Sequence, residues 1–174
     1  MKQKCSILNV LKVFFEEPLN LHFIREISKK INLAPTSVRN NIKELLKNNL
    51  IIKQKSKPFD GYVANRENSE FIFYKKVHNF YSLKKLAGFL DKNFYPRLAV
   101  VFGSYSLGED VETSDIDLLI ISKRKIELNK FEKELKREIN ILAIDNLNKL
   151  EKPILNKVYN GFVICGGFDE CRNF

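Results

Sequence analysis

Two aspartates separated by one residue, Asp115 and Asp117, stand at the start of an otherwise apolar run, IDLLII. Side chains on a β-strand alternate between its two faces, so a strand here places both carboxylates on one side. Two acids against an apolar strand are costly unless a cation neutralises them, although a solvated pair at the strand edge is the alternative. Hard divalent cations take oxygen ligands, so the spacing predicts that Asp115 and Asp117 bind Mg²⁺ or Mn²⁺.

A Gly-Ser pair, Gly103 and Ser104, follows the apolar run LAVVF, about ten residues before the aspartates. If a helix begins here, its free backbone N–H groups can bind a phosphate. The alternative is an ordinary strand-to-helix turn that uses glycine for its conformational freedom. A phosphate cradle beside a metal-binding acid pair predicts phosphoryl or nucleotidyl transfer.

The stretch FGSYSLGEDVETSDIDLLI resembles the signature of the DNA polymerase beta-like nucleotidyltransferase superfamily. The resemblance is closest to the minimal nucleotidyltransferases, some of which are antitoxins that nucleotidylate a partner toxin, and some archaeal members of which are fused to a winged helix. It implies catalysis by Asp115 and Asp117 with Mg²⁺ or Mn²⁺. It also implies that Gly103 and Ser104 hold the phosphates of a nucleoside triphosphate, expected to be ATP, and that the acceptor is a hydroxyl on a protein, such as a toxin-like partner, or on a small molecule.

Members of this superfamily carry a third acid on a neighbouring strand, and REINILAID resembles that strand. The position of the acid falls on Asn140, which can ligate a metal through its carbonyl oxygen but cannot accept a proton at neutral pH. Glu138, two residues earlier, is the alternative catalytic residue, because it shares the face of Asn140 on a strand. If neither completes the site, the domain is a slow enzyme or a nucleotide sensor.

Apolar spacing predicts helices over residues 5–15, 22–31 and 35–49, then a strand at 50–52 and a return strand near Tyr62. This order resembles a winged helix-turn-helix, in which the third helix reads DNA. The side chains expected to contact DNA lie on that helix and on the wing: Thr36, Ser37, Arg39, Asn40, Lys43, Lys53 and Lys55. A module for dimerisation or partner docking is the alternative, and a homodimer is compatible with either.

The remaining periodicity predicts one long helix over residues 69–93, a helix over 126–137, a strand over 138–144, a helix over 147–159 and a strand over 161–165. We therefore expect an α+β fold in which a winged helix-turn-helix (1–66) and a connecting helix (67–96) precede a nucleotidyltransferase-like domain (97–174). That domain is expected to be a small mixed sheet with flanking helices. His22 and His78 have no partner pattern and are expected to be structural.

Charge is unevenly distributed along the 174 residues, whose net charge is +9. Residues 1–90 hold 17 Lys and Arg against 7 Asp and Glu, whereas residues 91–174 hold 13 against 14. The asymmetry favours a polyanion partner for the first half, although solvated lysines would give the same count. We expect a cytoplasmic protein without membrane association, because no apolar run could span a bilayer and no signal peptide is evident. Cys5, Cys165 and Cys171 predict a reduced setting with no disulfide framework and no zinc site.

Overall fold

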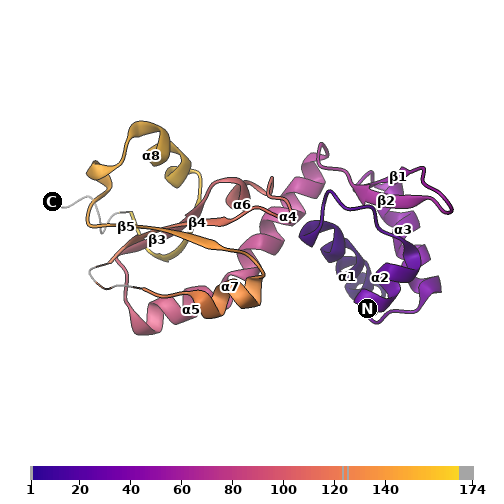
Figure 1. Cartoon of the computed structure of the whole chain (residues 1–174), viewed down its shortest axis with the longest axis horizontal. Helices are drawn as coiled ribbons and strands as arrows, with labels where there is room; N and C mark the ends of the chain where they lie inside the picture. Colours follow the sequence, from indigo (N-terminus) through magenta and orange to yellow (C-terminus); the bar gives the residue numbers. More distant parts are fainter. Residues whose placement is uncertain (1, 123, 125, 169–174) are drawn as a thin grey trace. The chain divides into compact units, whose positions relative to one another are not determined.

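The computed structural model describes residues 2–122, 124 and 126–168 (Figure 1). The chain forms two compact units, Met1–Lys75 and Lys76–Phe174, and the division falls inside helix α4 (Ser69–Ser82). Among the described residues, no helix is long and apolar enough to cross a membrane.

The first unit consists of three helices followed by a β-hairpin. The helices are α1 (Lys2–Glu16), α2 (Ile24–Lys30) and α3 (Pro35–Lys47), and the antiparallel strands are β1 (Ile51–Gln54) and β2 (Gly61–Ala64). Pro35 occupies the first turn of α3, where a missing N–H costs no helical hydrogen bond. These elements agree with the helices and the hairpin predicted for this region.

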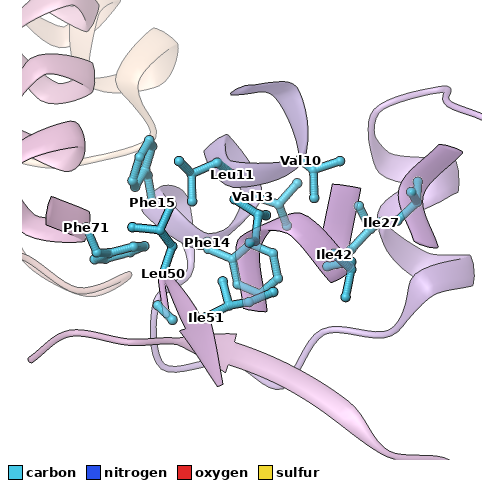
Figure 2. Close-up of a cluster of buried hydrophobic side chains, with 13 residues drawn as sticks. Val10, Leu11, Val13, Phe14, Phe15, Ile27, Ile42, Leu50, Ile51 and Phe71 are labelled. Atoms are coloured by element: carbon cyan, nitrogen blue, oxygen red, sulfur yellow. The ribbon is translucent and has the colours of Figure 1, made fainter. Parts of the chain in front are cut away.

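One hydrophobic core joins the elements of the first unit. Figure 2 shows its side chains converging from α1, α2, α3 and the hairpin, with Phe14 fully buried among them. Val38, Ile42 and Leu45 form the apolar stripe of α3, so that helix turns one face inward and leaves its opposite face to solvent. The packing therefore fixes which residues of α3 are exposed.

His22, between α1 and α2, forms an isolated β-bridge to Tyr62 of the hairpin. Its N–H donates to Tyr62 O at 2.8 Å, and Tyr62 N–H donates to His22 O at 2.9 Å. The link between α1 and α2 is thereby tied to strand β2, and the His22 side chain is buried.

The prediction of one long helix over 69–93 was wrong, because α4 ends at Ser82 and α5 (Lys84–Asn93) begins beyond Leu83. Ser82 Oγ donates to Asn79 O at 2.6 Å, and Leu83 N–H donates to Phe80 O at 3.2 Å, three residues back. A serine hydroxyl that competes for a helical carbonyl favours such a break.

The second unit is built on a four-stranded mixed sheet in the order β5-β4-β3-β6. Its strands are β3 (Leu98–Phe102), β4 (Ile116–Ile121), β5 (Ile139–Ile144) and β6 (Phe162–Gly166). Strand β4 runs parallel to β5, and β3 runs antiparallel to both of its neighbours. The overall class is α+β: N-terminal helices with a small hairpin, then a mixed sheet with helices.

Helices cover both faces of this sheet (Figure 1). Helices α5 and α7 (Asn129–Leu135) pack against one face, where they meet Ile116, Leu118 and Ile120 of β4. Helix α8 (Lys152–Tyr159) lies on the other face, with Leu119 and Ile121. Strand β4 therefore has a buried stripe on each side.

Two helices and one strand of this unit have ends that differ from those predicted. Helix α7 ends early because Lys136 adopts a left-handed conformation with φ 54°. The predicted helix over 147–159 is a short 3₁₀ turn, η1 (Leu147–Lys149), followed by α8, and Pro153 lies in the first turn of α8, where proline is favoured. The last strand begins one residue later than predicted.

Cys165 is free and buried, and burial raises the pKa of its thiol. The Cys5 side chain and Cys171 lie outside the described part of the chain, so the cysteine prediction is tested at Cys165 alone.

Candidate active site

Asp115 and Asp117 flank the first residue of β4, and they lie on the same side of that strand. Ile116, between them, is fully buried against the α5 and α7 face, so the two aspartates project from the face that α8 covers. Asp115 is exposed and Asp117 is half-buried. The sequence prediction that the two carboxylates share a face therefore agrees with the strand.

Strand register brings residues from β3 and β5 to Asp117. Phe102, the last residue of β3, pairs with Asp117 on one side, and Asn140 of β5 pairs with it on the other. Asn140 Nδ2 also donates a hydrogen bond of 3.2 Å to Asp115 Oδ2. Three oxygen-bearing side chains therefore meet at one end of the sheet.

Gly103 approaches Asp117 so closely that a larger residue would displace the Asp117 carboxylate. A Cβ built on Gly103 would lie 2.5 Å from Asp117 Oδ2, well inside van der Waals contact. The backbone of Gly103 also has φ 74° and ψ −158°, a conformation that favours glycine. The glycine thus lets the end of β3 run directly alongside the carboxylate.

Ser104 begins α6 (Ser104–Leu107), a four-residue helix closed by Gly108 in a left-handed conformation. A pocket of about 350 Å³ opens beside it. Side chains from the turn, from α6 and from α8 line this pocket: Gly103, Ser104, Ser106, Leu107, Glu109, Asn156, Lys157 and Asn160. Lys157 brings a positive charge to the Gly-Ser turn from a helix about fifty residues later in the chain.

A buried ion pair braces the loop between α6 and β4. Asp110 is fully buried, and its Oδ2 accepts a hydrogen bond of 2.9 Å from Arg137 Nη2. Arg137 Nη1 donates to the backbone oxygen of Ser114 at 2.7 Å, directly before Asp115. Because Arg137 lies just before β5, the guanidinium fixes the start of the aspartate segment relative to that strand.

Asn79 and Tyr105 complete the brace. Asn79 Nδ2, in the last turn of α4, donates to Asp110 Oδ1 and to the Tyr105 backbone oxygen, each at 2.8 Å. The Tyr105 hydroxyl lies 2.8 Å from Ser82 Oγ, and the Arg137 guanidinium sits over the Tyr105 ring at 5.6 Å. The loop that carries Asp115 is therefore held by two distant segments of the chain, the last turn of α4 and Arg137 before β5, and by Tyr105 of the neighbouring α6.

Sequence reasoning missed Lys157 and this brace. Asp110 lies within the stretch FGSYSLGEDVETSDIDLLI, so the sequence shows a charged residue in that loop. Its partners Asn79 and Arg137 lie 31 and 27 residues away, and only the folded sheet and helices bring them together.

Glu138 lies in the turn before β5, and its backbone oxygen accepts the Ile116 N–H at 2.9 Å. The residue is exposed and lines a shallow hollow of about 450 Å³ with Glu132, Lys133, Lys136 and Arg137. Glu138 is thus beside the aspartate segment through its backbone, whereas Asn140 contacts Asp115 through its side chain.

The residues expected to contact DNA lie on the solvent side of the first unit. Thr36, Arg39, Asn40 and Lys43 are exposed on α3, and Ser37 is half-buried. Lys53 and Lys55 are exposed at the hairpin. Lys53 Nζ forms a 2.8 Å ion pair with Asp60, which raises the pKa of Lys53 and lowers that of Asp60 through their hydrogen bond. The charge of Lys53 is therefore partly offset within the hairpin.

Residues 83–165 match the family model described as a nucleotidyltransferase domain. A comparison with curated proteins found no match to this sequence. The matched segment runs from Leu83 to Cys165, and it contains the Gly-Ser turn, both aspartates, Asn140 and Lys157. This part of the chain, slightly less than half of it, is similar to nucleotidyltransferase domains, and the match does not reach α1, α2, α3 or the hairpin.

Replacing Arg137 with methionine should destabilise the second unit by about 3–5 kcal/mol, because Asp110 would stay buried without its charge partner. Chemical denaturation of the full chain measures the loss, and hydrogen exchange over residues 108–116 should accelerate. Arg124→Met removes an exposed arginine from the same unit and serves as the matched control. Equal effects of the two substitutions would contradict the bracing role.

Proposed function

We propose that the second unit transfers a nucleoside monophosphate from a nucleoside triphosphate, with ATP as the expected substrate, to a hydroxyl on a protein or a small molecule. The acceptor oxygen bonds to the α-phosphorus, the bond between the α- and β-phosphates breaks, and pyrophosphate leaves. The observation that carries this proposal is the convergence of Asp115, Asp117 and Asn140 beside a glycine turn that opens into a pocket with Lys157. The match of this segment to a nucleotidyltransferase domain supports the same chemistry.

The residues present fit a divalent cation. Asp115 and Asp117 project from one side of β4, and Asn140 stands at the paired position on β5. All three offer oxygen atoms, which Mg²⁺ and Mn²⁺ prefer, and Asp115 remains exposed for a ligand. When bound there, the cation supplies charge neutralisation for the phosphates and the reacting oxygens.

The protein's own residues divide the remaining work. Gly103 and Ser104 are proposed to bind the outer phosphates through backbone N–H groups and the serine hydroxyl, and Lys157 to offset their charge. Asn140 positions the Asp115 carboxylate through its hydrogen bond. Catalysis on this scheme consists of orientation and electrostatic stabilisation in a prearranged site.

A general base must accept the proton of the acceptor hydroxyl. Asn140 occupies the position of the third acid but cannot accept a proton. We propose Glu138 as the base, because its backbone is hydrogen-bonded to Ile116, between the two aspartates. A carboxylate side chain is long enough to extend past the strand end toward the acceptor.

A second candidate function follows from Asn140. An amide at this position leaves the cation site with one carboxylate fewer than the superfamily pattern, and that favours nucleotide binding over turnover. In this alternative the second unit senses a nucleotide or a protein partner, and the chain acts as a regulator.

The first unit is proposed to be a winged helix-turn-helix that binds DNA. Three helices precede a hairpin, and His22 forms an isolated β-bridge to its strand β2. The exposed face of α3 carries Thr36, Arg39, Asn40 and Lys43. Positive and amide side chains suit phosphate and base-edge contacts. DNA binding is compatible with either function of the second unit. We also propose a toxin-like protein as the acceptor and a homodimer as the assembly, and both proposals rest on the family resemblance alone.

Substituting Asp115 and Asp117 together with alanine should abolish label transfer from α-labelled ATP in the presence of Mg²⁺ or Mn²⁺ and an acceptor protein. Binding of a fluorescent ATP analogue with Mn²⁺ should weaken by at least about tenfold, because the cation links the phosphates to the protein. Asp145→Ala, an exposed aspartate that follows the last residue of β5, is the matched control.

Asn140→Asp separates the two candidate functions in the same assay. If the wild-type domain only binds nucleotide because it lacks a third carboxylate, Asn140→Asp should increase label transfer. If the wild-type domain is an active enzyme with Glu138 as the base, Glu138→Gln should reduce label transfer. Label transfer that persists after removal of both aspartates contradicts the site assignment.

Arg39→Ala combined with Lys43→Ala should weaken binding of the full chain to duplex DNA and reduce the salt dependence. The slope of log K against log salt should fall by about one for each phosphate contact removed. Lys55→Ala should weaken binding more than Lys53→Ala, because Asp60 already pairs with Lys53. Fluorescence anisotropy in a salt series measures both effects, and Lys130→Ala in the second unit is the control. Unchanged affinity in the double variant argues for a docking module instead.

A further inference from the structure

Three side chains around the connection between α1 and α2 form a second cluster of ligand-type groups, in the first unit. Glu17, His22 and Glu26 each offer one atom to it, and these atoms all lie within 4.8 Å of one another. No local sequence pattern groups these residues, and the sequence predicts a structural role for His22.

The hydrogen bond of His22 defines the state of its ring. Nε2 lies 2.9 Å from the Glu17 backbone oxygen, which can only accept a hydrogen bond, so Nε2 carries the proton. In the neutral imidazole the lone pair is then on Nδ1. The side chain is fully buried, and Nδ1 has no hydrogen-bond partner within residues 2–122, 124 and 126–168.

Nδ1 lies close to a carboxylate. It is 3.5 Å from Glu26 Oε1, without a hydrogen bond between the two atoms, so a nitrogen lone pair and a carboxylate oxygen are near neighbours. A buried acceptor without a donor is unfavourable, and a second acceptor opposite adds repulsion. A positive charge between the two atoms would remove both of these unfavourable contributions.

The ring is held rigidly in this orientation. The backbone of His22 forms both hydrogen bonds of its bridge to Tyr62, and the ring stacks edge-on against Phe14 at a centroid distance of 5.0 Å. Histidines that ligate metals commonly donate their other ring N–H to a carbonyl or carboxylate, and this fixes the tautomer and the ring plane. His22 has that second contact already in place.

The two carboxylates already have partners within the first unit. Glu26 is about half exposed and caps α2 by accepting the Phe23 N–H at 3.4 Å. Lys30 hydrogen-bonds the Glu17 carboxylate and lowers its pKa below the ordinary value. That ammonium also competes with any cation for Glu17, so it limits the affinity of the site.

We propose that Glu17, His22 and Glu26 bind a divalent transition-metal ion, for which Zn²⁺ is the best fit. A mixed imidazole and carboxylate set suits Zn²⁺ better than Mg²⁺ or Ca²⁺, which prefer oxygen alone. Two ligands at about 2.0–2.1 Å from a tetrahedral Zn²⁺ stand roughly 3.3–3.5 Å apart, and Nδ1 and Glu26 Oε1 are 3.5 Å apart. Three protein ligands leave the fourth position for water.

The ion would join the end of α1 to the first turn of α2, and through the His22 backbone to strand β2. Its effect would therefore be on the arrangement of the helices and hairpin of the first unit, independent of nucleotide chemistry at Asp115 and Asp117. The alternative occupant of the gap is a proton on Nδ1, which would make His22 an imidazolium paired with Glu26.

The test uses the full chain carrying Asp115→Asn and Asp117→Asn, so that the cation site of the second unit is removed. Isothermal titration with Zn²⁺, and the visible absorption of Co²⁺ in its place, should show one ion per chain. Glu26→Gln should weaken binding by about 100-fold or more, since loss of even an outer-shell partner costs about 10–100-fold. This exposed position leaves the buried ring intact, and His22→Gln, read with circular dichroism as a folding check, removes the nitrogen ligand.

Glu16→Gln, at the end of α1 and outside the cluster, is the matched control and should bind Zn²⁺ as the parent does. Absence of stoichiometric Zn²⁺ and Co²⁺ binding overturns the proposal and assigns the gap to a proton. Binding that Glu26→Gln leaves unchanged overturns it as well, because the ion would then lie elsewhere on the chain.

Discussion

The antiparallel pairing of β3 with β4 is the constraint on which the candidate active site depends. It sets Phe102 opposite Asp117, so the chain leaves β3 at Gly103 with its backbone against the Asp117 carboxylate. A shift of the register by one residue would exchange the two faces of β4, so the aspartates would enter the α5 and α7 face and Ile116 would leave it. The apolar side chains of β3 and β4, buried on both faces of the sheet, hold that register in place.

Everything beyond this pair is brought to the site by longer-range contacts. Strand β5 adds Asn140 through parallel pairing, α8 adds Lys157, and the Asp110–Arg137 ion pair fixes the loop that ends at Asp115. A buried ion pair that also satisfies backbone oxygens serves to position a loop more than to add net stability. The second unit thus combines a rigid Gly-Ser turn and aspartate pair with a third position that holds an amide in place of an acid.

The sequence predicted those parts of the structure in which the determining residues are neighbours in the chain. Strand alternation placed Asp115 and Asp117 on one face, Pro35 marked the start of α3, and the apolar stripe of α3 identified its exposed side. The break after Ser82 escaped prediction because the helical apolar spacing continues across it through Phe80, Leu83 and Leu86. The contacts of Asn79, Arg137 and Lys157, and the cluster around His22, join segments whose meeting depends on the finished fold, and no local pattern specifies them.

The most direct test of the central claim is a crystal structure of the full chain with Mn²⁺ and a non-hydrolysable ATP analogue. We expect anomalous scattering from Mn²⁺ at the Asp115 and Asp117 carboxylates, with the triphosphate against Gly103 and Ser104 and within reach of Lys157. A triphosphate bound elsewhere, or Mn²⁺ that does not touch the two aspartates, would contradict it.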